Sequence, residues 1–512
     1  MRVWHCLTAA GVRFLVALKS WTGSGQAVAH GQDRANVESM STHGRRVAII
    51  GGGLAGLAAA AAAVDCGFDV ELFEARRRLG GRAGSFADPE SGQRVDHCQH
   101  VAMGCCTNWA DFCRRTEIID CFERHARLHF IGPDGRQCDF AAAALLPAPL
   151  HLLPALFRLK FLSLSERWGV ARAVVRLARG ERRATSDTIG EWLRGQGQSE
   201  RALQRFWAPI LTSALSESLD RASTAAARQV FRDGFLAHRR AYELEIPRAP
   251  LGEICDRRVA EWLGKRGVAI HLSTRVEGIE GTAENAVSIR LADKSERPFD
   301  FFVAAVPWGR VKSLLPAAML DKIPGLESVD QIAPAPITAV HLWFDRPITA
   351  LPHAVLVGRL GQWVFHRSGE SGSGRSADYY QVVISASHGL KGRKREEVVA
   401  EVCSELGAIW PAARDAELLR WRMVTEPAAV FSMRPGVERL RPAQRTPIAN
   451  LALAGDWTDT GWPATMEGAV RSGYLAVEAI LAAAGESRRI LVPGLTPGRL
   501  ARRLMGFDEQ TR

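Results

Sequence analysis

One glycine-rich turn near the start of the chain restricts its fold more than any other feature. The segment Val47-Ala48-Ile49-Ile50 is apolar and rich in β-branched residues, which is typical of a strand buried on both faces of a parallel sheet. It leads into a G-x-G-x-x-G turn at residues 51–56, and six consecutive alanines follow at residues 58–63. A strand, such a turn and a helix in this order predict a dinucleotide-binding βαβ unit.

The residues of this turn have separate expected roles. Gly51 permits the tight turn, Gly53 lets the backbone approach a pyrophosphate, and Gly56 lets the helix lie close to the sheet. The phosphates would lie at the helix N-terminus, where free N–H groups and the helix dipole favour negative charge. We expect the cofactor to contact the whole turn, including Gly52 and Ala55.

A second predicted strand, Asp69–Phe73, ends at an acidic residue. Glu74 stands 23 residues after Gly51, about where a carboxylate that binds a ribose hydroxyl belongs. We therefore expect Glu74 and its neighbour Ala75 to lie at the ribose of a dinucleotide. The alternative is a glycine turn of the same shape that binds no nucleotide.

The residues after this acid extend the pattern. They read E-A-x4-G-G-R-x-x-S over twelve residues from Glu74, which resembles the extended fingerprint of the flavin-containing amine oxidase and phytoene desaturase superfamily. The resemblance implies that the cofactor is FAD and that Gly80, Gly81 and Arg82 pack beside its pyrophosphate. A guanidinium independently suits a pair of phosphates. Many amine oxidases attach flavin through a cysteine near the C-terminal motif, but the last cysteine here is Cys403, so we expect non-covalent FAD.

The far end of the chain carries the partner motif of that fingerprint. Residues 451–454 read as a buried strand that ends in Gly455-Asp456, and a helix is predicted to begin in the stretch Thr465-Met466-Glu467-Gly468. In the superfamily such an aspartate bonds FAD and such a helix start faces the flavin ring. The resemblance therefore implies FAD contacts from Gly455, Asp456, Thr465 and Met466, and it implies that the backbone of Val276 covers the adenine.

A closer resemblance is to the hydroxysqualene dehydroxylase family of bacterial squalene and hopanoid biosynthesis. It covers roughly residues 45–485 and rests on the segments 95–107, 247–251 and 455–473. Where that family typically reads D-N-G-Q-H, this chain reads Asp96-His97-Cys98-Gln99-His100. The resemblance implies an FAD-dependent oxidoreductase that reductively removes the hydroxyl of hydroxysqualene, a C30 polyprenoid, to give squalene, with an unidentified reductant for the FAD. Asp96 and His100 are the candidate catalytic acids, and a structural role is the alternative for each.

Two other functions fit the same motifs. A carotenoid desaturase of the phytoene type, or another polyprenoid FAD oxidoreductase, would run the flavin in the opposite direction. A non-catalytic prenyl-lipid carrier resembling the Rab GDP-dissociation inhibitors would share the fold without the chemistry. An amine substrate fits poorly, because Thr465 stands where the pattern W-x-x-Y-M-E-G would place a tyrosine, and the whole chain has four tyrosines.

The net charge of +11 is concentrated in two segments. Residues 158–183 hold eight Lys or Arg against two Glu, and residues 488–512 hold six Arg against two acidic residues. The first segment overlaps a stretch, residues 145–164, with eleven leucines and phenylalanines, and Arg172, Arg176, Arg179 and Arg183 recur on one face of a predicted helix. The pattern predicts a cytoplasmic protein that attaches peripherally to an anionic membrane surface. The alternative is an internal pair of helices whose arginines are solvated. The sequence contains no known nucleic-acid-binding motif, so we expect no nucleic-acid partner.

The ten cysteines include no C-x-x-C pair, and a chain of 512 residues needs no disulfide framework. We expect free, mostly buried thiols in a reducing compartment. The group His97, Cys98, His100, Cys105 and Cys106 fits no common zinc spacing, so we expect no metal site.

The motifs at both ends and in the middle of the chain require a discontinuous FAD-binding domain. We expect its pieces at 45–130, 245–320 and 445–486, and the pieces of a substrate domain at 131–244 and 321–444. An N-terminal extension at 1–44 and a basic tail at 487–512 complete the chain. The predicted fold class is α/β, a Rossmann-like domain with an inserted α+β domain. Alternating segments at 339–344 and 381–385 predict an antiparallel sheet in that insert, whose face could line a lipid tunnel.

Overall fold

The computed structural model describes residue 42 and residues 44–90, 92–180, 187–367 and 377–507. Met40–Arg512 form one compact unit. Almost all of the expected N-terminal extension, Arg183 of the predicted basic helix and the last five residues of the basic tail lie outside the described residues.

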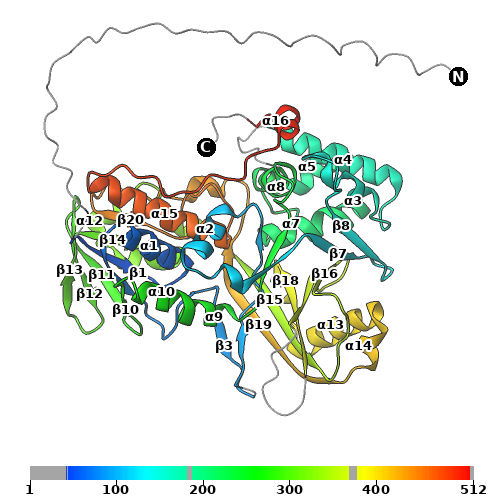
Figure 1. Cartoon of the computed structure of the whole chain (residues 1–512), viewed down its shortest axis with the longest axis horizontal. Helices are drawn as coiled ribbons and strands as arrows, with labels where there is room; N and C mark the ends of the chain where they lie inside the picture. Colours follow the sequence, from blue (N-terminus) through cyan, green and yellow to red (C-terminus); the bar gives the residue numbers. More distant parts are fainter. Residues whose placement is uncertain (1–41, 43, 91, 181–186, 368–376, 508–512) are drawn as a thin grey trace, which may run out of the picture. The chain divides into compact units, whose positions relative to one another are not determined.

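A five-stranded parallel sheet carries the two FAD motifs (Figure 1). Its strands stand in the order β10-β2-β1-β14-β20, and every neighbouring pair is parallel. They come from three distant stretches of the sequence, which confirms that this Rossmann-like part is discontinuous. The strands are β1 (Arg46–Ile50), β2 (Asp69–Phe73), β10 (Ala269–His271), β14 (Phe301–Ala304) and β20 (Leu451–Leu453).

Two helices from opposite ends of the chain pack together beside this sheet. The helix α1 (Leu54–Asp65) contains the alanine run, and residues 58–63 are fully buried. The helix α15 (Met466–Ala483) lies so close to it that a Cβ on Gly473 would overlap the carbonyl oxygen of Ala55. Small residues on both helices therefore hold the N-terminal and C-terminal motifs in one core.

A seven-stranded sheet is the main β-sheet of the inserted region. Its order is β19-β15-β18-β17-β16-β7-β8. The pairs are antiparallel, as the sequence predicted, except that β16 and β7 are parallel. These two strands come from distant segments, so no hairpin turn fixes their relative direction. The strands are β7 (Arg127–Ile131), β8 (Gln137–Ala141), β15 (Pro334–Phe344), β16 (His353–Leu356), β17 (Trp363–Arg367), β18 (Asp378–Ser385) and β19 (Leu418–Phe431).

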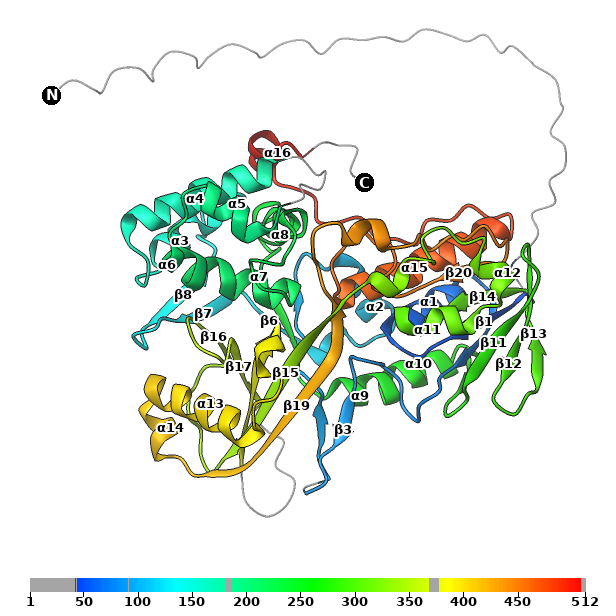
Figure 2. The same cartoon turned by 180° about the vertical axis from the view of Figure 1, so that it is seen from behind.

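The two faces of the seven-stranded sheet have different neighbours, because side chains alternate between faces along each strand. On β15, Val340, Leu342 and Phe344 pack in the core shared with α13 (Arg395–Ile409) and α14 (Pro411–Asp415). Figure 2 shows these two helices together on that side. Ala339 and His341 alternate with these residues, so they lie on the opposite face, which we call the inner face.

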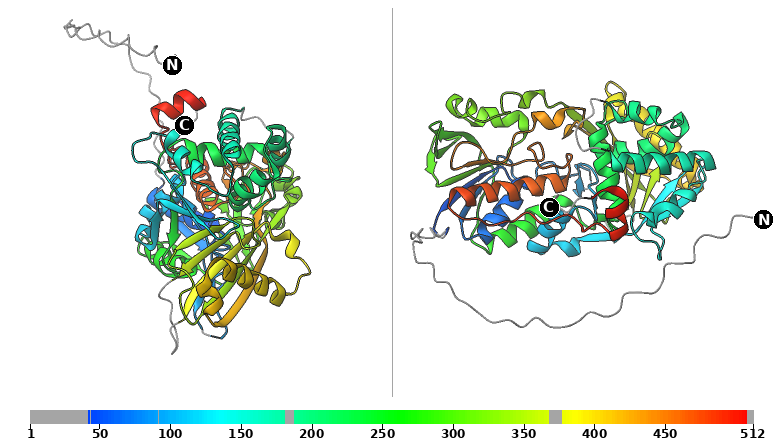
Figure 3. Two further views of the ribbon diagram at one scale, coloured as in Figure 1. Left: turned by 90° about the vertical axis from the view of Figure 1, so that its right-hand side faces the viewer. Right: turned by 90° about the horizontal axis from the view of Figure 1, so that it is seen from above.

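The two basic segments of the sequence lie side by side. The helix α4 (Leu164–Arg179) begins with a capping box formed by Ser163 and Glu166, and α16 (Arg499–Met505) packs against it. The Arg179 Nε donates a hydrogen bond of 2.6 Å to the carbonyl oxygen of Leu504. Figure 3 shows α16 next to the helices of the insert. Those helices include α3 (Leu153–Phe157), α5 (Ile189–Gly195), α6 (Glu200–Ala202), α7 (Ala208–Leu215) and α8 (Thr224–Phe231).

Smaller elements connect the two main sheets. The expected domain boundary at 130/131 falls inside β7, and the boundary at 244/245 falls inside β9 (Leu244–Pro247). The strand β9 pairs with both β5 and β6. The remaining strands are β3 (Ser85–Ala87), β4 (Arg94–Asp96), β5 (Ala102–Met103), β6 (Phe122–His125), β9 (Leu244–Pro247), β11 (Val276–Gly281), β12 (Ala286–Leu291) and β13 (Glu296–Pro298). The remaining α-helices are α2 (Thr107–Arg115), α9 (Leu251–Glu253), α10 (Ala260–Gly264), α11 (Trp308–Leu314) and α12 (Ala317–Leu320).

The cysteines match the expectation of free thiols. All nine cysteines in the described ranges are unpaired, and seven of them are buried. In the same part of the chain, no group of three or more His, Cys, Asp or Glu side chains is placed to hold a metal ion. None of the described helices is long and apolar enough to cross a bilayer.

Candidate active site

The glycines of the first turn differ in what surrounds them. Gly51 has φ +113°, and a Cβ there would overlap the carbonyl oxygen of Ala305. A Cβ on Gly56 would overlap the carbonyl oxygen of Gly51. A Cβ on Gly53 would meet nothing within 4 Å, and Gly53 is the N-cap of α1. Two glycines are thus required by the fold, whereas Gly53 leaves open space at a helix N-terminus, which fits a diphosphate.

Glu74 lies beside this turn, as the spacing predicted. Its carboxylate is buried and accepts hydrogen bonds from the backbone N–H of Gly52 at 2.8 Å and of Arg76 at 2.7 Å. The carbonyl oxygen of Glu74 accepts from the N–H of Thr274, two residues before Val276. The structure thereby joins Glu74, which precedes the exposed Ala75, to the segment that leads into Val276, the third expected contact of the adenosine end.

The second glycine pair packs directly against the first turn. The N–H of Gly80 donates to the carbonyl oxygen of Gly52 at 2.8 Å, and Gly53 and Gly80 form a parallel β-bridge. Gly80 and Gly81 have φ of +89° and +60°, which favour glycine. A Cβ on Gly81 would lie 3.1 Å from the Cα of Gly53. Both fingerprints therefore border the same open space.

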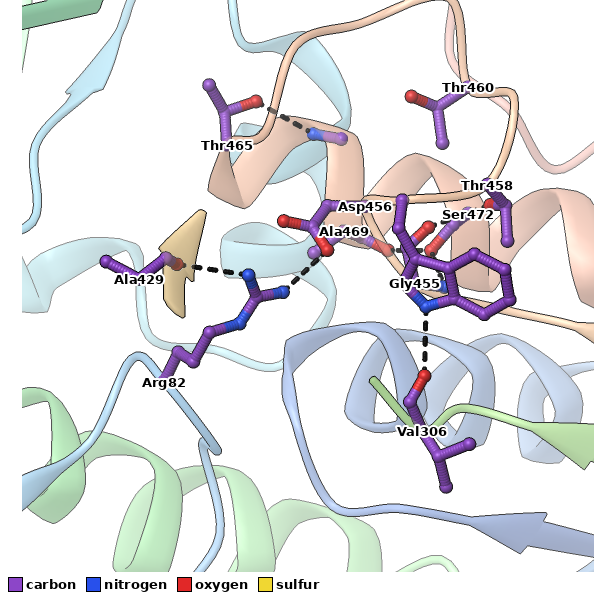
Figure 4. A network of polar contacts seen from close by, with 12 residues as sticks. Arg82, Val306, Ala429, Gly455, Asp456, Thr458, Thr460, Thr465, Ala469 and Ser472 are labelled. Carbon is purple, nitrogen blue, oxygen red and sulfur yellow. Dashed lines mark hydrogen bonds and ion pairs between the residues drawn. The ribbon is translucent and has the colours of Figure 1, made fainter. Parts of the chain in front are cut away.

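Arg82 connects this region to the C-terminal motif, as Figure 4 shows. Its Nη2 donates to the Asp456 Oδ1 at 2.5 Å, and its Nη1 donates to the carbonyl oxygen of Ala429 on β19 at 3.0 Å. The Asp456 side chain is 5% exposed and that of Arg82 is 34% exposed. The guanidinium thus places a positive charge near the turn while part of it stays accessible to a ligand.

The start of α15 completes this arrangement. Thr465 is its N-cap, and the hydroxyl accepts from the N–H of Gly468 at 3.1 Å. Met466 is buried at the first helical position. The N–H of Gly455 donates to the Ser472 hydroxyl at 2.8 Å, which ties the end of β20 to the same helix (Figure 4). All four expected C-terminal contacts therefore lie around one helix start.

Two residues that sequence reasoning missed hold this motif in place. Arg441 is buried and donates to the carbonyl oxygens of Asp456 and Thr458, and burial lowers its pKa. Glu467 is buried and accepts from the N–H groups of Asn108 and Trp109 at the start of α2. Burial raises the pKa of Glu467. Arg441 belongs to no recognisable motif, whereas Glu467 is part of the M-E-G-A motif and could have been found from it.

The candidate acids Asp96 and His100 lie on the strand and loop that follow the second fingerprint. The Asp96 Oδ1 accepts from the Ser85 hydroxyl at 2.6 Å and from the Leu251 N–H at 2.7 Å. Burial raises the pKa of Asp96, and the positive charge of Arg367 opposes the shift. The Nδ1 of His100 lies 2.9 Å from the carbonyl oxygen of Cys98, and burial lowers the pKa of His100. The two shifts favour a protonated Asp96 and a neutral His100, so Asp96 is the better proton donor.

Comparison with known proteins agrees with this geometry. The profile of the family "Flavin containing amine oxidoreductase" matches residues 54–481. The zeta-carotene desaturase of Synechocystis sp. is 26% identical over 477 residues, covering 85% of this chain and 97% of that protein. The hydroxysqualene dehydroxylase of Rhodopseudomonas palustris is 28% identical over 455 residues, covering 86% of this chain and 99% of that protein.

A solved structure, of an oxidoreductase from Methanosarcina mazei, superimposes with a TM-score of 0.65 at 17% identity. It covers 85% of this chain and 100% of that one, and at this identity the likeness concerns the fold. The family match spans most of the chain, from the end of the first glycine turn through the second fingerprint and the C-terminal motif. The open space at Gly53 and the charge of Arg82 fit the pyrophosphate of that cofactor. The chain therefore belongs to the flavin containing amine oxidoreductase family and is an FAD-dependent oxidoreductase.

Proposed function

We propose that this oxidoreductase removes the hydroxyl of hydroxysqualene reductively and releases squalene. The observation that carries the proposal is the buried carboxyl of Asp96, which the Ser85 hydroxyl and the Leu251 N–H hold in place and whose pKa burial raises. Departure of a hydroxyl as water needs a proton donor, whereas a desaturase that removes hydrogen from a hydrocarbon does not. The resemblance of residues 95–107 to the dehydroxylase family supports the same reading.

The chemistry requires two hydrogens and one leaving group. Reduced FAD, held by the two fingerprints and the start of α15, would supply a hydride and a proton to the reaction. Asp96 in its acid form donates a proton to the substrate hydroxyl, and the C–O bond breaks. Water departs, and an allylic cation remains. The cationic carbon would take up the hydride, and the proton from the reduced cofactor would restore the acid form of Asp96. One hydroxysqualene and one reduced FAD thus give one squalene, one water and one oxidised FAD.

Residues of both main sheets serve this reaction in the proposal. We assign FAD binding to residues that border the open space at the two fingerprints and the start of α15. The inner face of the seven-stranded sheet is largely apolar, with Ala339 and Val355 fully buried, and it would hold the C30 chain away from water. The residues assigned to FAD are Gly51, Gly52, Gly53, Ala55, Gly56, Glu74, Ala75, Gly80, Gly81, Arg82, Val276, Gly455, Asp456, Thr465 and Met466.

We also propose that an anionic membrane surface delivers the lipid. Of the seven large hydrophobic residues that are exposed in the described part of the chain, four lie between residues 145 and 168. Leu145 is 95% exposed, and Leu164 and Trp168 at the start of α4 are 65% and 62% exposed. Arg172 and Arg176 follow them along α4 and are exposed, as are Arg499 and Arg503 on α16, which packs against α4. An apolar patch next to basic helices suits the interface of an anionic bilayer.

Flotation with liposomes tests the membrane proposal. The protein should float with vesicles that contain phosphatidylglycerol and stay at the bottom with pure phosphatidylcholine. The variant Leu164→Ser/Trp168→Ser should lose flotation. The control Leu272→Ser/Val287→Ser removes exposed apolar residues elsewhere and should float like the parent. Equal flotation of the two variants would contradict the proposed surface.

The direction of electron flow tests the choice between dehydroxylase and desaturase. Oxidised enzyme mixed anaerobically with phytoene or zeta-carotene should keep its flavin absorbance. Photoreduced enzyme mixed with hydroxysqualene should regain it. Bleaching of the oxidised enzyme by a carotene would instead identify a carotenoid desaturase, the alternative that the relatives also support.

A further inference from the structure

A pocket with several cationic side chains lies at the edge of the seven-stranded sheet. Its volume is about 380 Å³, and it is lined by residues of β7 and β8 and of the segment that follows α3. The strand β8 is the last one in the order of this sheet, and Figure 2 shows it next to α3. Pockets that hold small ligands commonly measure about 300–1,000 Å³. We call it the basic pocket, and its charged lining residues are Arg127, Asp139, Arg158 and Lys160.

The charges of the basic pocket do not cancel. The Arg127 Nη1 donates to the Asp139 Oδ2 at 2.9 Å, and the Asp139 Oδ1 also accepts from the Gln137 Nε2 at 2.7 Å. Arg158 and Lys160 are exposed, and neither forms an ion pair with any residue that the structure describes. The pocket therefore carries two positive charges without a counter-charge. A concave surface with an excess of one charge concentrates the electric field and attracts ions of the opposite sign.

The backbone that carries these two cations is fixed to the rest of the fold. Leu159, which stands between Arg158 and Lys160, is fully buried and anchors the segment in the core. The Arg167 side chain on α4 donates to the carbonyl oxygens of Phe157 at 2.8 Å and of Leu159 at 3.0 Å. The guanidinium and the ammonium thus offer several N–H donors from a well-defined position, which suits the oxygens of a phosphate.

The basic pocket adjoins the exposed apolar residues at the start of α4. Phe157 directly precedes Arg158, and its ring meets the ring of Trp168 edge-on at 4.8 Å. Trp168 and Leu164 are the exposed apolar residues for which we propose contact with a bilayer. Apolar side chains of an interfacial protein enter the boundary of the acyl chains, next to the layer of lipid headgroups. A bilayer that receives Leu164 and Trp168 would therefore bring its phosphates to the neighbouring pocket.

We propose that the basic pocket binds the headgroup phosphate of one anionic phospholipid, which Arg158 and Lys160 hold while Leu164 and Trp168 lie at the acyl chains. The inference rests on the membrane attachment in the proposed function and adds a specific lipid site to it. A zwitterionic lipid fits less well, because its choline cation would meet two cations that have no counter-charge. A free phosphate fits less well, because it makes no use of the apolar residues beside the pocket.

Titration of the full-length holoenzyme with a short-chain lipid tests the pocket without a membrane. The probe is dihexanoyl phosphatidylglycerol, kept below the concentration at which it forms micelles, and calorimetry measures its binding. The parent should bind one lipid per chain. Arg158→Gln/Lys160→Gln should bind it at least about 10-fold more weakly, because two charge-assisted hydrogen bonds are lost.

A charge-matched variant separates this site from general attraction. Lys391→Gln/Arg395→Gln also removes one exposed lysine and one exposed arginine, located just before and at the start of α13 and outside the basic pocket. It should keep the lipid affinity of the parent. Equal weakening in the two double variants would show only long-range attraction and overturn the proposal. Both variants should unfold at the temperature of the parent, because the side chains that they replace are exposed.

Two further probes identify the ligand. Inorganic phosphate and dihexanoyl phosphatidylcholine should each bind the parent at least about 10-fold more weakly than dihexanoyl phosphatidylglycerol. Inorganic phosphate that binds as tightly as the anionic lipid would make free phosphate the ligand and overturn the proposal. Equal affinity for the two lipids, or no saturable binding of the anionic lipid, would overturn it as well.

The lipid site and the proposed function can fail separately, because the titration uses neither hydroxysqualene nor a vesicle. Absence of lipid binding, in an enzyme that floats with phosphatidylglycerol vesicles and converts hydroxysqualene, overturns the lipid site and leaves the proposed function standing. Lipid binding that Arg158→Gln/Lys160→Gln abolishes, in an enzyme that fails to convert hydroxysqualene, supports the lipid site and overturns the proposed reaction.

Discussion

The Arg82 Nη2 lies 2.5 Å from the Asp456 Oδ1, although 374 residues separate the two in the sequence. This ion pair joins the second glycine fingerprint to the C-terminal motif. The Asp456 side chain is almost fully buried, so the carboxylate depends on its partner. The ion pair therefore couples the two ends of the proposed FAD site.

Removing this partner should destabilise the cofactor-free protein. Arg82→Met should lower the free energy of unfolding by about 2 kcal/mol, because a buried charged acceptor loses its donor. Arg257→Met breaks an exposed helical pair with Glu253 and should cost below about 0.5 kcal/mol. Urea unfolding measures both values. In a double-mutant cycle, Arg82→Met and Asp456→Asn should be non-additive, and additivity would contradict the coupling.

The glycines of the first turn should separate folding from cofactor binding. Gly56→Ala should prevent correct folding, because its Cβ would overlap the Gly51 carbonyl oxygen. Gly53→Ala should leave the thermal unfolding of the cofactor-free protein unchanged, since its Cβ meets open space. The same variant should bind FAD more weakly, as fluorescence titration would measure. Normal FAD affinity in Gly53→Ala would show that the pyrophosphate lies elsewhere.

The proposed acid predicts a pH profile. The rate at which hydroxysqualene reoxidises the reduced enzyme should fall as pH rises through the pKa of Asp96, which burial raises above that of an ordinary carboxyl. Asp96→Asn should lower the rate about 100-fold or more and remove this dependence. His100→Gln should retain the profile, because His100 is already neutral in this account. Loss of the profile in His100→Gln alone would reassign the acid.

The buried histidines predict loss of stability in acid. Burial, reinforced by His125 and His129, lowers the pKa of His353 to about 3 in the folded protein, against about 6.5 when unfolded. The unfolded state therefore binds more protons between these values, so stability is complete above pH of about 6.5 and falls toward 3.

This group contributes up to about 1.4 kcal/mol per pH unit in that window. His353→Phe should therefore show a shallower fall of unfolding free energy between neutral pH and pH of about 4. If the unfolding free energies of His353→Phe and the parent fell in parallel with pH, His353 would already be charged in the folded state, which would contradict the prediction.

The sequence allowed the βαβ unit and both FAD motifs to be predicted, because each is a local pattern whose chemistry requires its residue types. The strand, the glycine turn and the alanine helix at residues 46–65 are found where expected. The antiparallel pairing of residues 339–344 with residues in the 381–385 strand also follows from alternation. Local patterns, however, do not report which distant strand becomes a neighbour, and the parallel contact of β16 with β7 was missed.

The parts of the site that depend on tertiary packing could not be predicted. Arg441 is a single arginine in an irregular segment whose partners are carbonyl oxygens of another loop. The contact of α16 with α4 brings two basic segments together, although like charges repel and their net charges alone would predict that they lie apart. Each arises from tertiary packing rather than from local sequence.

Anaerobic single turnover of photoreduced enzyme with hydroxysqualene tests the central claim most directly. Squalene is quantified by mass spectrometry while the flavin absorbance is followed. One squalene should form for each flavin reoxidised, and phytoene should reoxidise no flavin. Flavin that stays reduced in the presence of hydroxysqualene, or reoxidation without formation of squalene, would contradict the claim.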